Sequence, residues 1–203
     1  MEKVDFKREF KAAYTAKAGK PVLVDVPAFS FLMVDGAGDP NGPAFMEAIQ
    51  ALYSVSYTLK FANKAAGHGP DYTVMPLEGL WWSDNPDVDF REDRRERWRW
   101  TAMIHQPSWV TEAIFRDAAA EAGRKKENPG VGRLRLERFA EGRAAQVLHV
   151  GPYDQEGPTI EALHAFVAGQ GLSLRGHHHE IYLGDPRRTA PERLKTILRH
   201  PVG

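Results

Sequence analysis

Cysteine is absent from this chain of 203 residues. Disulfide bridges, thiol nucleophiles and cysteine-based zinc sites are therefore excluded, and the composition fits a reducing compartment. The chain also lacks a net charge, because 27 Lys and Arg residues balance 27 Asp and Glu residues. A protein that binds nucleic acid through bulk charge needs a basic excess, so we expect no nucleic-acid partner.

Long apolar runs are also missing. No stretch approaches the ~20 apolar residues of a membrane span, and the mixed, charged residues 1–13 lack the apolar core of a signal peptide. We therefore expect a cytoplasmic protein without a membrane partner. Nucleotide-binding glycine loops and the serine elbow G-x-S-x-G are absent too, so the sequence predicts no cofactor.

The chain does contain a turn pattern that occurs twice. Gly36 to Pro43 and Gly151 to Pro158 both read G-x-x-D-x-x-G-P. Each copy follows an apolar segment typical of a strand and precedes a segment typical of a helix. A pattern repeated in the same local context indicates one structural unit used twice. The seam between two such units is a natural place for a ligand.

Periodicity and turn residues predict the remaining elements. Strands are expected at 22–26 and 29–34 as one hairpin, at 71–75, 78–83 and 97–104, at 133–139 and 144–150 as a second hairpin, and at 177–183. Helices are expected at 44–60, 109–122, 159–168 and 190–199. The last helix is predicted because Thr189 and Glu192 have the spacing of a capping box.

Hairpins followed by helices favour an α+β fold with antiparallel sheets over a doubly wound parallel sheet. No low-complexity linker divides the chain, so residues 1–203 are expected to form a single domain. Its parts are a first repeat over about 20–83, an insert over about 84–132, a second repeat over about 133–186 and a C-terminal helix over about 190–199.

The repeated unit, Leu80-Trp81-Trp82 and the run from His179 to Glu192, HEIYLGDPRRTAPE, resemble the GyrI-like family. This family is related to the effector-binding domains of multidrug-responsive transcription activators. The resemblance covers nearly the whole chain. It implies two pseudo-symmetric βαββ-type repeats with a ligand groove between them, plus extra helices.

The resemblance also implies a function. Family members bind bulky, flat, often cationic compounds beside a buried acidic residue among aromatic rings. Some stand-alone members hydrolyse the cyclopropane of DNA-alkylating natural products and so protect the cell. Because no helix-turn-helix or coiled coil is found ahead of the domain, the transcription-activator role is not carried over.

Glu180 is the first candidate for this site. It lies in an otherwise apolar segment, and strand alternation places it on the same face as Tyr182. A desolvated carboxylate would attract a cation, and a raised pKa would let Glu180 act as a general acid. On the residues alone, an exposed or arginine-paired glutamate is the commoner outcome. The resemblance favours the pocket, with Glu180 and Tyr182 as catalytic residues.

Aromatic residues are the candidates for the groove wall, because flat rings suit planar and cationic ligands. Trp81 and Trp82 point to opposite faces, so at most one of them lines the groove, and core packing is an equal alternative for each tryptophan. Tyr153 stands where the first turn has Gly38, which indicates either a groove residue or a ring on the surface. The predicted ligand-binding set is Phe45, Tyr72, Trp82, Trp100, Tyr153, Glu180 and Tyr182.

A metal site is the alternative use of His177 and His179, which share a strand face. No third ligand stands at a familiar spacing, so no metal is predicted. Three functions stay open: hydrolysis of a cyclopropane-bearing compound, sequestration of a hydrophobic aromatic small molecule without chemistry, and a gyrase-inhibitor-like interaction with a protein. The sequence leaves the oligomeric state open.

Overall fold

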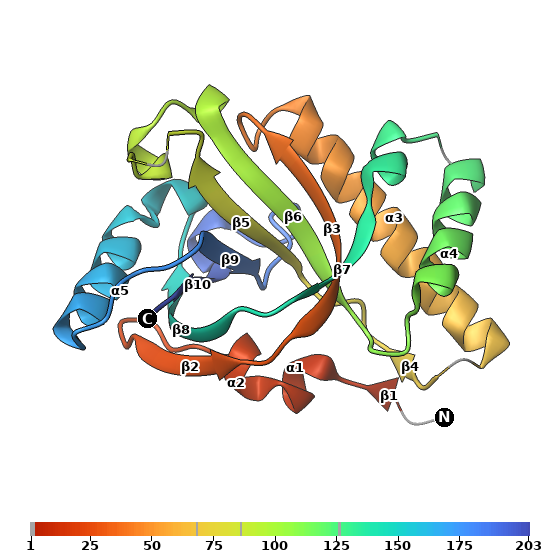
Figure 1. The fold of residues 1–203 in the computed structure, drawn as a ribbon, viewed down its shortest axis with the longest axis horizontal. Helices are drawn as coiled ribbons and strands as arrows, with labels where there is room; N and C mark the ends of the chain where they lie inside the picture. The colour runs from red at the N-terminus through yellow and green to blue at the C-terminus, as the bar shows by residue number, and fades with distance from the viewer. Residues whose placement is uncertain (1–2, 68, 86, 126) are drawn as a thin grey trace.

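The computed structural model describes residues 3–67, 69–85, 87–125 and 127–203 (Figure 1). Most strands belong to one sheet: β2 (Val22–Val26), β3 (Phe29–Ala37), β5 (Leu77–Ser83), β6 (Trp98–Gln106), β7 (Arg135–Phe139), β8 (Gly142–Val150), β9 (His178–Tyr182) and β10 (Lys195–Pro201). Their order across this curled, antiparallel, eight-stranded sheet is β2-β8-β10-β9-β5-β6-β3-β7. Two short strands, β1 (Lys3–Val4) and β4 (Asp71–Tyr72), form a separate parallel pair.

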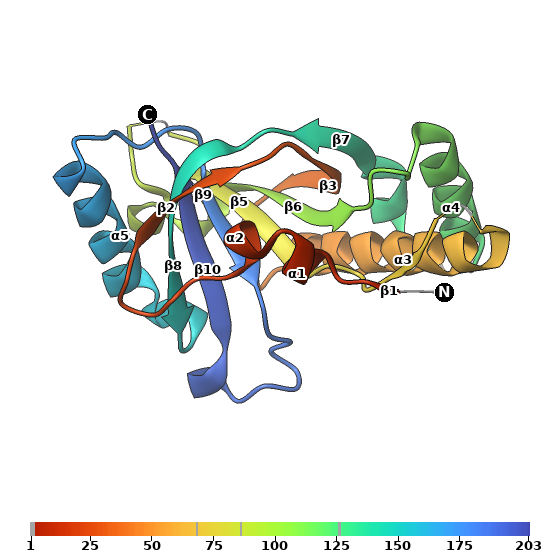
Figure 2. The same cartoon turned by 90° about the horizontal axis from the view of Figure 1, so that it is seen from below.

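The helices are α1 (Phe6–Glu9), α2 (Lys11–Tyr14), α3 (Pro43–Ala66), α4 (Glu112–Lys125) and α5 (Gly157–Gly169). Single 3-10 turns are η1 (Phe90–Glu92), η2 (Arg95–Arg97), η3 (Pro129–Arg133), η4 (Tyr153–Gln155) and η5 (Pro191–Arg193). Figure 1 shows α3 and α5 towards opposite ends of the sheet, with α4 beside α3, and Figure 2 shows α1 and α2 together at the sheet. The apolar sides of α3 and α5 cover one face of the sheet, and α1 and α2 cover the other face.

The strand order confirms the α+β fold of two pseudo-symmetric units. One unit is β3-α3-β5-β6 and the other is β8-α5-β9-β10, each of the form βαββ. In the sheet, β5-β6-β3 and β9-β10-β8 run outward from a central β5–β9 contact, so a pseudo-twofold axis passes between β5 and β9. The repeated turn pattern lies between the first strand and the helix of each unit.

The two predicted hairpins are wrong. Although β2 and β3 are consecutive, β2 pairs with β8 of the other unit, while β3 pairs with β6 and β7. The same exchange separates β7 from β8. The strand that precedes each unit thus pairs with an edge strand of the other unit: β2 pairs with β8, and β7 pairs with β3. These pairings connect the two halves. The segment expected to be an insert contains β6, the last strand of the first unit.

The predicted C-terminal helix is also wrong. Beyond the single turn η5, the chain forms β10, which pairs with β8 on one side and β9 on the other. Thr196, Ile197 and Leu198 are fully buried there. A capping-box spacing contributes about 1 kcal/mol to a helix, whereas this strand gains hydrogen bonds on both edges and buries both faces.

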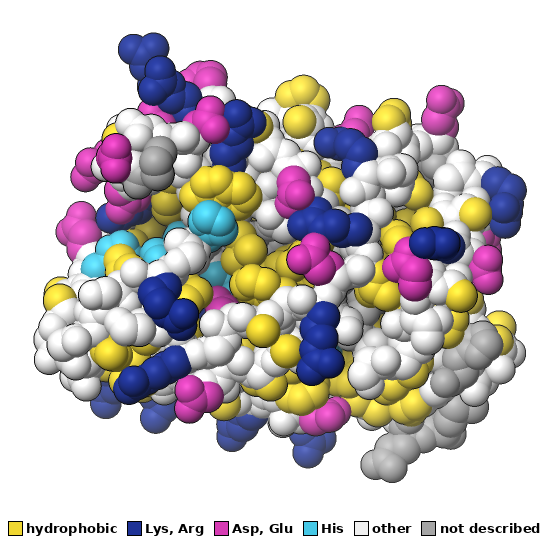
Figure 3. Space-filling model, viewed as in Figure 1, with side chains coloured by type: hydrophobic (Ala, Val, Ile, Leu, Met, Phe, Trp, Pro, Cys, Tyr) yellow, Lys and Arg dark blue, Asp and Glu magenta, His cyan; other side chains and the backbone are white. Residues whose placement is uncertain are grey.

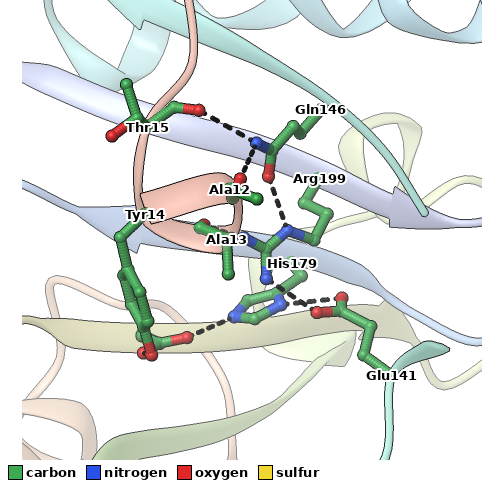
Figure 4. Close-up of polar contacts among 9 residues, drawn as sticks. Ala12, Ala13, Tyr14, Thr15, Glu141, Gln146, His179 and Arg199 are labelled. Atoms are coloured by element: carbon green, nitrogen blue, oxygen red, sulfur yellow. Dashed lines mark hydrogen bonds and ion pairs between the residues drawn. The ribbon is translucent and has the colours of Figure 1, made fainter. Parts of the chain in front are cut away.

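The face of the sheet under α1 and α2 carries a buried polar network, drawn in Figure 4. The His179 ring lies between two carboxylates, with Nδ1 2.8 Å from Glu141 and Nε2 3.0 Å from Glu78. Burial opposes the charge on His179, but these carboxylates outweigh it and raise the pKa of His179 to about 9. Tyr14 donates a 2.8 Å hydrogen bond to Glu78 and so brings α2 onto the network.

Arg199 completes the network and fixes the N-terminal segment. Its guanidinium donates to Glu141 at 2.8 Å, to Gln146 at 3.0 Å and to the carbonyl of Ala13. Gln146 donates in turn to the carbonyls of residues 12 and 15. Two cations and two carboxylates thus balance in the interior, and the network serves to anchor residues 12–15 on the sheet.

Candidate functional site

The opposite face carries the candidate site, at the seam between the two units. Strand alternation in β9 points His178, Glu180 and Tyr182 to this face, away from His179. Across the seam, Gly79 of β5 pairs with Glu180, and Trp81 pairs with His178. Both units therefore supply side chains to one cluster.

Hydrogen bonds fix the orientation of the Glu180 carboxylate. The hydroxyl of Tyr182 donates to Glu180 Oε2 at 2.6 Å, and Trp81 Nε1 donates to the same hydroxyl at 3.0 Å. On the other side, His178 Nε2 lies 3.2 Å from Glu180 Oε1. Glu180 is 8% exposed. The structure therefore has a buried carboxylate with two flanking polar groups and an indole behind them.

A second carboxyl group, that of Glu156, lies near enough to Glu180 for the two charges to interact. It comes from the second repeated turn, directly before α5, and it is buried as well. Burial and the adjacent negative charge of Glu180 raise the pKa of Glu156 to about 10. Sequence reasoning missed this residue. The available signal was the divergence of the two turns, since Glu156 stands where the first turn has Asn41.

Tyr153 forms the outer edge of the cluster. Its ring lies 5.5 Å from that of Tyr182 in an edge-to-face arrangement, and its side of the turn is open to solvent, with 38% of the residue exposed. Partial burial, followed by the nearby carboxyl groups of Glu156 and Glu180, raises the pKa of Tyr153 to about 12. The structure thus brings Tyr153, Glu180 and Tyr182 together.

The other predicted wall residues do not contact Glu180: Phe45 and Trp100 lie one layer deeper, Tyr72 lies elsewhere, and Trp82 lines the neighbouring cleft. Phe45 lies between Trp81 and Trp100, with ring centroids 5.2 and 4.9 Å away, so it supports the cluster from α3. Trp100 is fully buried. Trp82 points to the opposite face and stacks on His177 at 4.1 Å. Of the two consecutive tryptophans, Trp81 is therefore the one that is linked to Glu180, through the hydroxyl of Tyr182.

Tyr72 packs in the core and not at the seam. Its ring contacts those of Phe6 and Trp109, and Lys60 lies over it. Its aromatic ring was the reason for predicting it in the wall, but its strand β4 pairs with β1 outside the main sheet.

A cleft of about 550 Å³ adjoins the cluster. Both units line it: the end of β5 and the β5–β6 connection supply residues 83–85 and 87–90, and α5, β9 and β10 supply the opposite wall. Trp81 and His178 line the cleft and also contact the carboxyl cluster, so the two are continuous. Further apolar and aromatic lining residues are Trp82, Phe90, Ile160, Leu174 and His177.

Histidine side chains are concentrated in this cleft, and Figure 3 shows them in a hollow of the molecule. His164 and His200 each have one buried ring nitrogen without a hydrogen-bond partner among the described residues, and His178 has two. Burial, together with the neighbouring imidazoles, lowers the pKa of His200 to about 3, and burial also lowers that of His164. These two rings are therefore neutral at pH 7 and can accept hydrogen bonds from a ligand.

Metal binding finds little support in the geometry. Within the described parts of the chain, no group of three or more His, Asp or Glu side chains is arranged to hold a metal ion. Of the histidine pair considered from the sequence, His179 has both ring nitrogens engaged by carboxylates, and His177 stacks on Trp82. No helix within the described ranges is long and apolar enough to cross a membrane.

A half-barrel made of two βαββ units, with an acidic and aromatic cluster at their seam, defines a small-molecule-binding domain. Residues 19–202 match the family described as the GyrI-like small molecule binding domain, and the chain belongs to this family. No match was found among curated proteins.

Solved structures agree with this assignment. A conserved protein from Listeria innocua is 42% identical, with a TM-score of 0.91, over 98% of this chain and 100% of that one. A protein described as a hydrolase from the same organism is 41% identical, with a TM-score of 0.88, over 100% of both chains. The C-terminal domain of EcmrR is 12% identical, with a TM-score of 0.55, over 91% of this chain and 97% of that one, and shares the fold.

Proposed function

We propose that this protein acts in the cytoplasm, where it binds bulky, planar, hydrophobic or cationic small molecules at the seam. In this proposal it hydrolyses cyclopropane-bearing DNA-alkylating compounds and so protects the cell. The observation that carries the proposal is the buried Glu180 carboxylate, held by a 2.6 Å hydrogen bond from Tyr182 beside a cleft lined by aromatic rings. A ligand in the cleft would stack on these rings and present a polar or charged group to Glu180.

The similarity to the Listeria innocua hydrolase supports an enzymatic role, because it extends over both full chains at 41% identity. The site has the groups that such a reaction needs. A strained cyclopropane joined to a conjugated carbonyl is already electrophilic, so an oriented water and one acid–base group suffice. Nucleic acid is not part of this proposal.

The reaction can be written with these groups alone. The oxygen of a water molecule forms a bond to the ring CH₂ carbon while Glu180 accepts a proton from that water. The adjacent ring C–C bond breaks, its electron pair moves into the conjugated carbonyl, and the carbonyl oxygen takes up a proton. The product equals substrate plus one water, and Glu180 returns to its starting state when its proton leaves. The hydrogen bond from Tyr182 holds the Glu180 carboxylate in one orientation during the reaction.

Sequestration without chemistry is the second candidate function, and the same cleft would support it. The two are separated by incubating the purified protein with a duocarmycin-type cyclopropane compound and following the mass of the ligand. We expect a water-added product that Glu180→Gln does not form, that Tyr182→Phe forms more slowly, and that Glu161→Gln, an exposed carboxyl change on α5, forms normally.

Each outcome decides between the candidates. Tight binding without any change of mass would leave a sequestering module. Neither binding nor turnover would reject the small-molecule proposal for this ligand class and favour the gyrase-inhibitor-like interaction with a protein.

A further inference from the structure

Two carboxyl groups meet at the seam, and they come from different parts of the second unit. Glu156 precedes α5 and Glu180 lies in the middle of β9. Only 4% of Glu156 and 8% of Glu180 is exposed. Two neighbouring carboxylates that are shielded from water cannot both stay ionised, since each charge disfavours the other and burial disfavours both.

The surroundings offer no cation to offset two charges. Among the described residues, neither carboxyl forms an ion pair with Lys or Arg, and His178 is the one basic group within 4 Å of Glu180. The other titratable or polar groups near these carboxyls are Tyr182, Tyr153 and Thr196 from β9, η4 and β10. Hydroxyl groups can donate hydrogen bonds to one carboxylate, but they bring no positive charge.

The hydrogen-bond pattern distinguishes the two carboxyls. Glu180 Oε2 accepts the short bond from Tyr182, as an ionised oxygen does. Glu156 Oε1 is buried and has no donor from the described residues. An acceptor left without a donor is costly for a carboxylate and much less so for a neutral carboxylic acid. The raised pKa of Glu156, about 10, agrees with this assignment.

We infer that Glu156 is a second functional carboxyl of this site, which shares one proton with Glu180, and that binding of a cationic ligand drives this proton into solvent. The inference rests on the proposed function in one respect, namely that cationic ligands bind beside Glu180. In the free protein the pair carries a single negative charge. A bound cation can compensate a second charge, so Glu156 ionises as the ligand enters.

The size of the effect follows from the charges. An opposite charge within ~4–6 Å lowers a carboxyl pKa by about 1–3 units. Starting from about 10, Glu156 would be largely protonated at pH 8.5 without ligand, and a pKa lowered to about 7–9 by the cation would leave it between about a quarter and almost fully ionised. We therefore expect release of roughly 0.2 to 0.9 proton per cation bound at that pH.

The experiment is calorimetric titration with ethidium, a planar permanent monocation, in two buffers of different ionisation enthalpy at pH 8.5. The difference between the two observed heats counts the protons released. Phenanthridine, the uncharged ring system at this pH, is the matched neutral ligand and should release none. Glu156→Gln, which mimics the protonated side chain, should bind ethidium without proton release, and Glu161→Gln should behave like the wild type.

A second measurement needs no ligand. Infrared difference spectroscopy of the free protein at pH 8 should show a protonated carboxyl band that Glu156→Gln lacks and Glu161→Gln keeps. Ethidium binding with less than about a tenth of a proton released, equal release in Glu156→Gln, or absence of the carboxyl band would each overturn the inference while leaving the proposed function intact. If ethidium does not bind the wild type, both the inference and the proposed binding of cations are wrong.

Discussion

Gly79 lies directly opposite Glu180 across the seam, and its missing side chain makes the room that the site needs. A β-carbon at Gly79 would lie 2.8 Å from Trp81 Nε1 and 3.3 Å from the hydroxyl of Tyr182. The hydrogen bonds that orient Glu180 thus depend on a glycine in the neighbouring strand. Its φ angle is not in the left-handed region, so the requirement is for space and not for backbone freedom.

Gly79→Ala should therefore disturb the site directly. We expect the indole of Trp81 to move and its hydrogen bond to Tyr182 to break, with a loss of about 1–3 kcal/mol of stability and weaker ligand binding. Thermal unfolding and ligand titration measure the two effects. Gly123→Ala in α4, where a β-carbon meets nothing within 4 Å, is the control. It should instead stabilise the protein by about 0.5–1 kcal/mol, and equal behaviour of the two variants would contradict the argument.

Removal of Arg199 should destabilise the protein strongly. Arg199→Met keeps the length of the side chain but leaves the buried Glu141 with one cationic partner instead of two, and it frees the carbonyl of Ala13. Loss of one partner from a buried ion pair costs about 3–5 kcal/mol. Denaturant unfolding measures it. Arg187→Met breaks the exposed pair with Asp185 and should leave the unfolding midpoint unchanged.

The pH dependence of stability should carry the signature of His179. Its pKa in the folded protein, about 9, lies above the ordinary value of 6.5. The stabilisation is thus fully present below pH 6.5 and is lost as the pH rises through 9. We expect His179→Gln to be clearly less stable than the wild type at pH 6, with the difference shrinking towards pH 10. Unfolding free energies at both pH values test this, and a pH-independent difference would contradict it.

At acidic pH the same network should respond through Glu141. Burial raises its pKa, but His179 and Arg199 outweigh burial and lower that pKa to about 2. A group with a lowered pKa stabilises the fold above its unfolded value of about 4.5 and loses that contribution as the pH falls towards 2. The contributions of Glu141 and His179 are therefore both complete between about pH 4.5 and pH 6.5.

Local features of the fold could be predicted from the sequence, because they are encoded within a few residues. The repeated turns illustrate this: the Asp39 side chain accepts a hydrogen bond from the backbone N–H of Asn41, Gly38 has a φ of +94°, and Pro43 starts α3. The alternation that places Glu180 and Tyr182 on one face is local too, and the structure has them side by side.

Strand partners could not be predicted in the same way. The pairing of β2 with β8 joins residues more than 100 positions apart, and nothing local distinguishes it from a hairpin with β3. Alternation could show that Trp81 and Trp82 face opposite sides, but the face of the seam depends on how β5 meets β9. Glu156 was missed for a related reason, since its interaction with Glu180 joins its turn to β9, and nothing within the turn indicates this partner.

Trp81→Phe should test how far the site depends on the orientation of Glu180. The substitution keeps an aromatic ring beside Phe45 and in the cleft wall but removes the N–H that donates to Tyr182 at 3.0 Å. A single hydrogen bond contributes about 0.5–1.5 kcal/mol, which corresponds to at most about a tenfold change in rate or affinity. We expect ligand binding to fall by less than tenfold and formation of the water-added product to fall more than binding does, because orientation matters most for the reaction. Trp82→Phe is the matched control: Trp82 also lines the cleft, but its indole donates no hydrogen bond among the described residues, so any change in binding should change turnover equally and the ratio of turnover to binding should stay at the wild-type value. If both variants lowered the two quantities in parallel, Trp81 would serve as cleft wall alone, and Tyr182 would orient Glu180 without help from the indole.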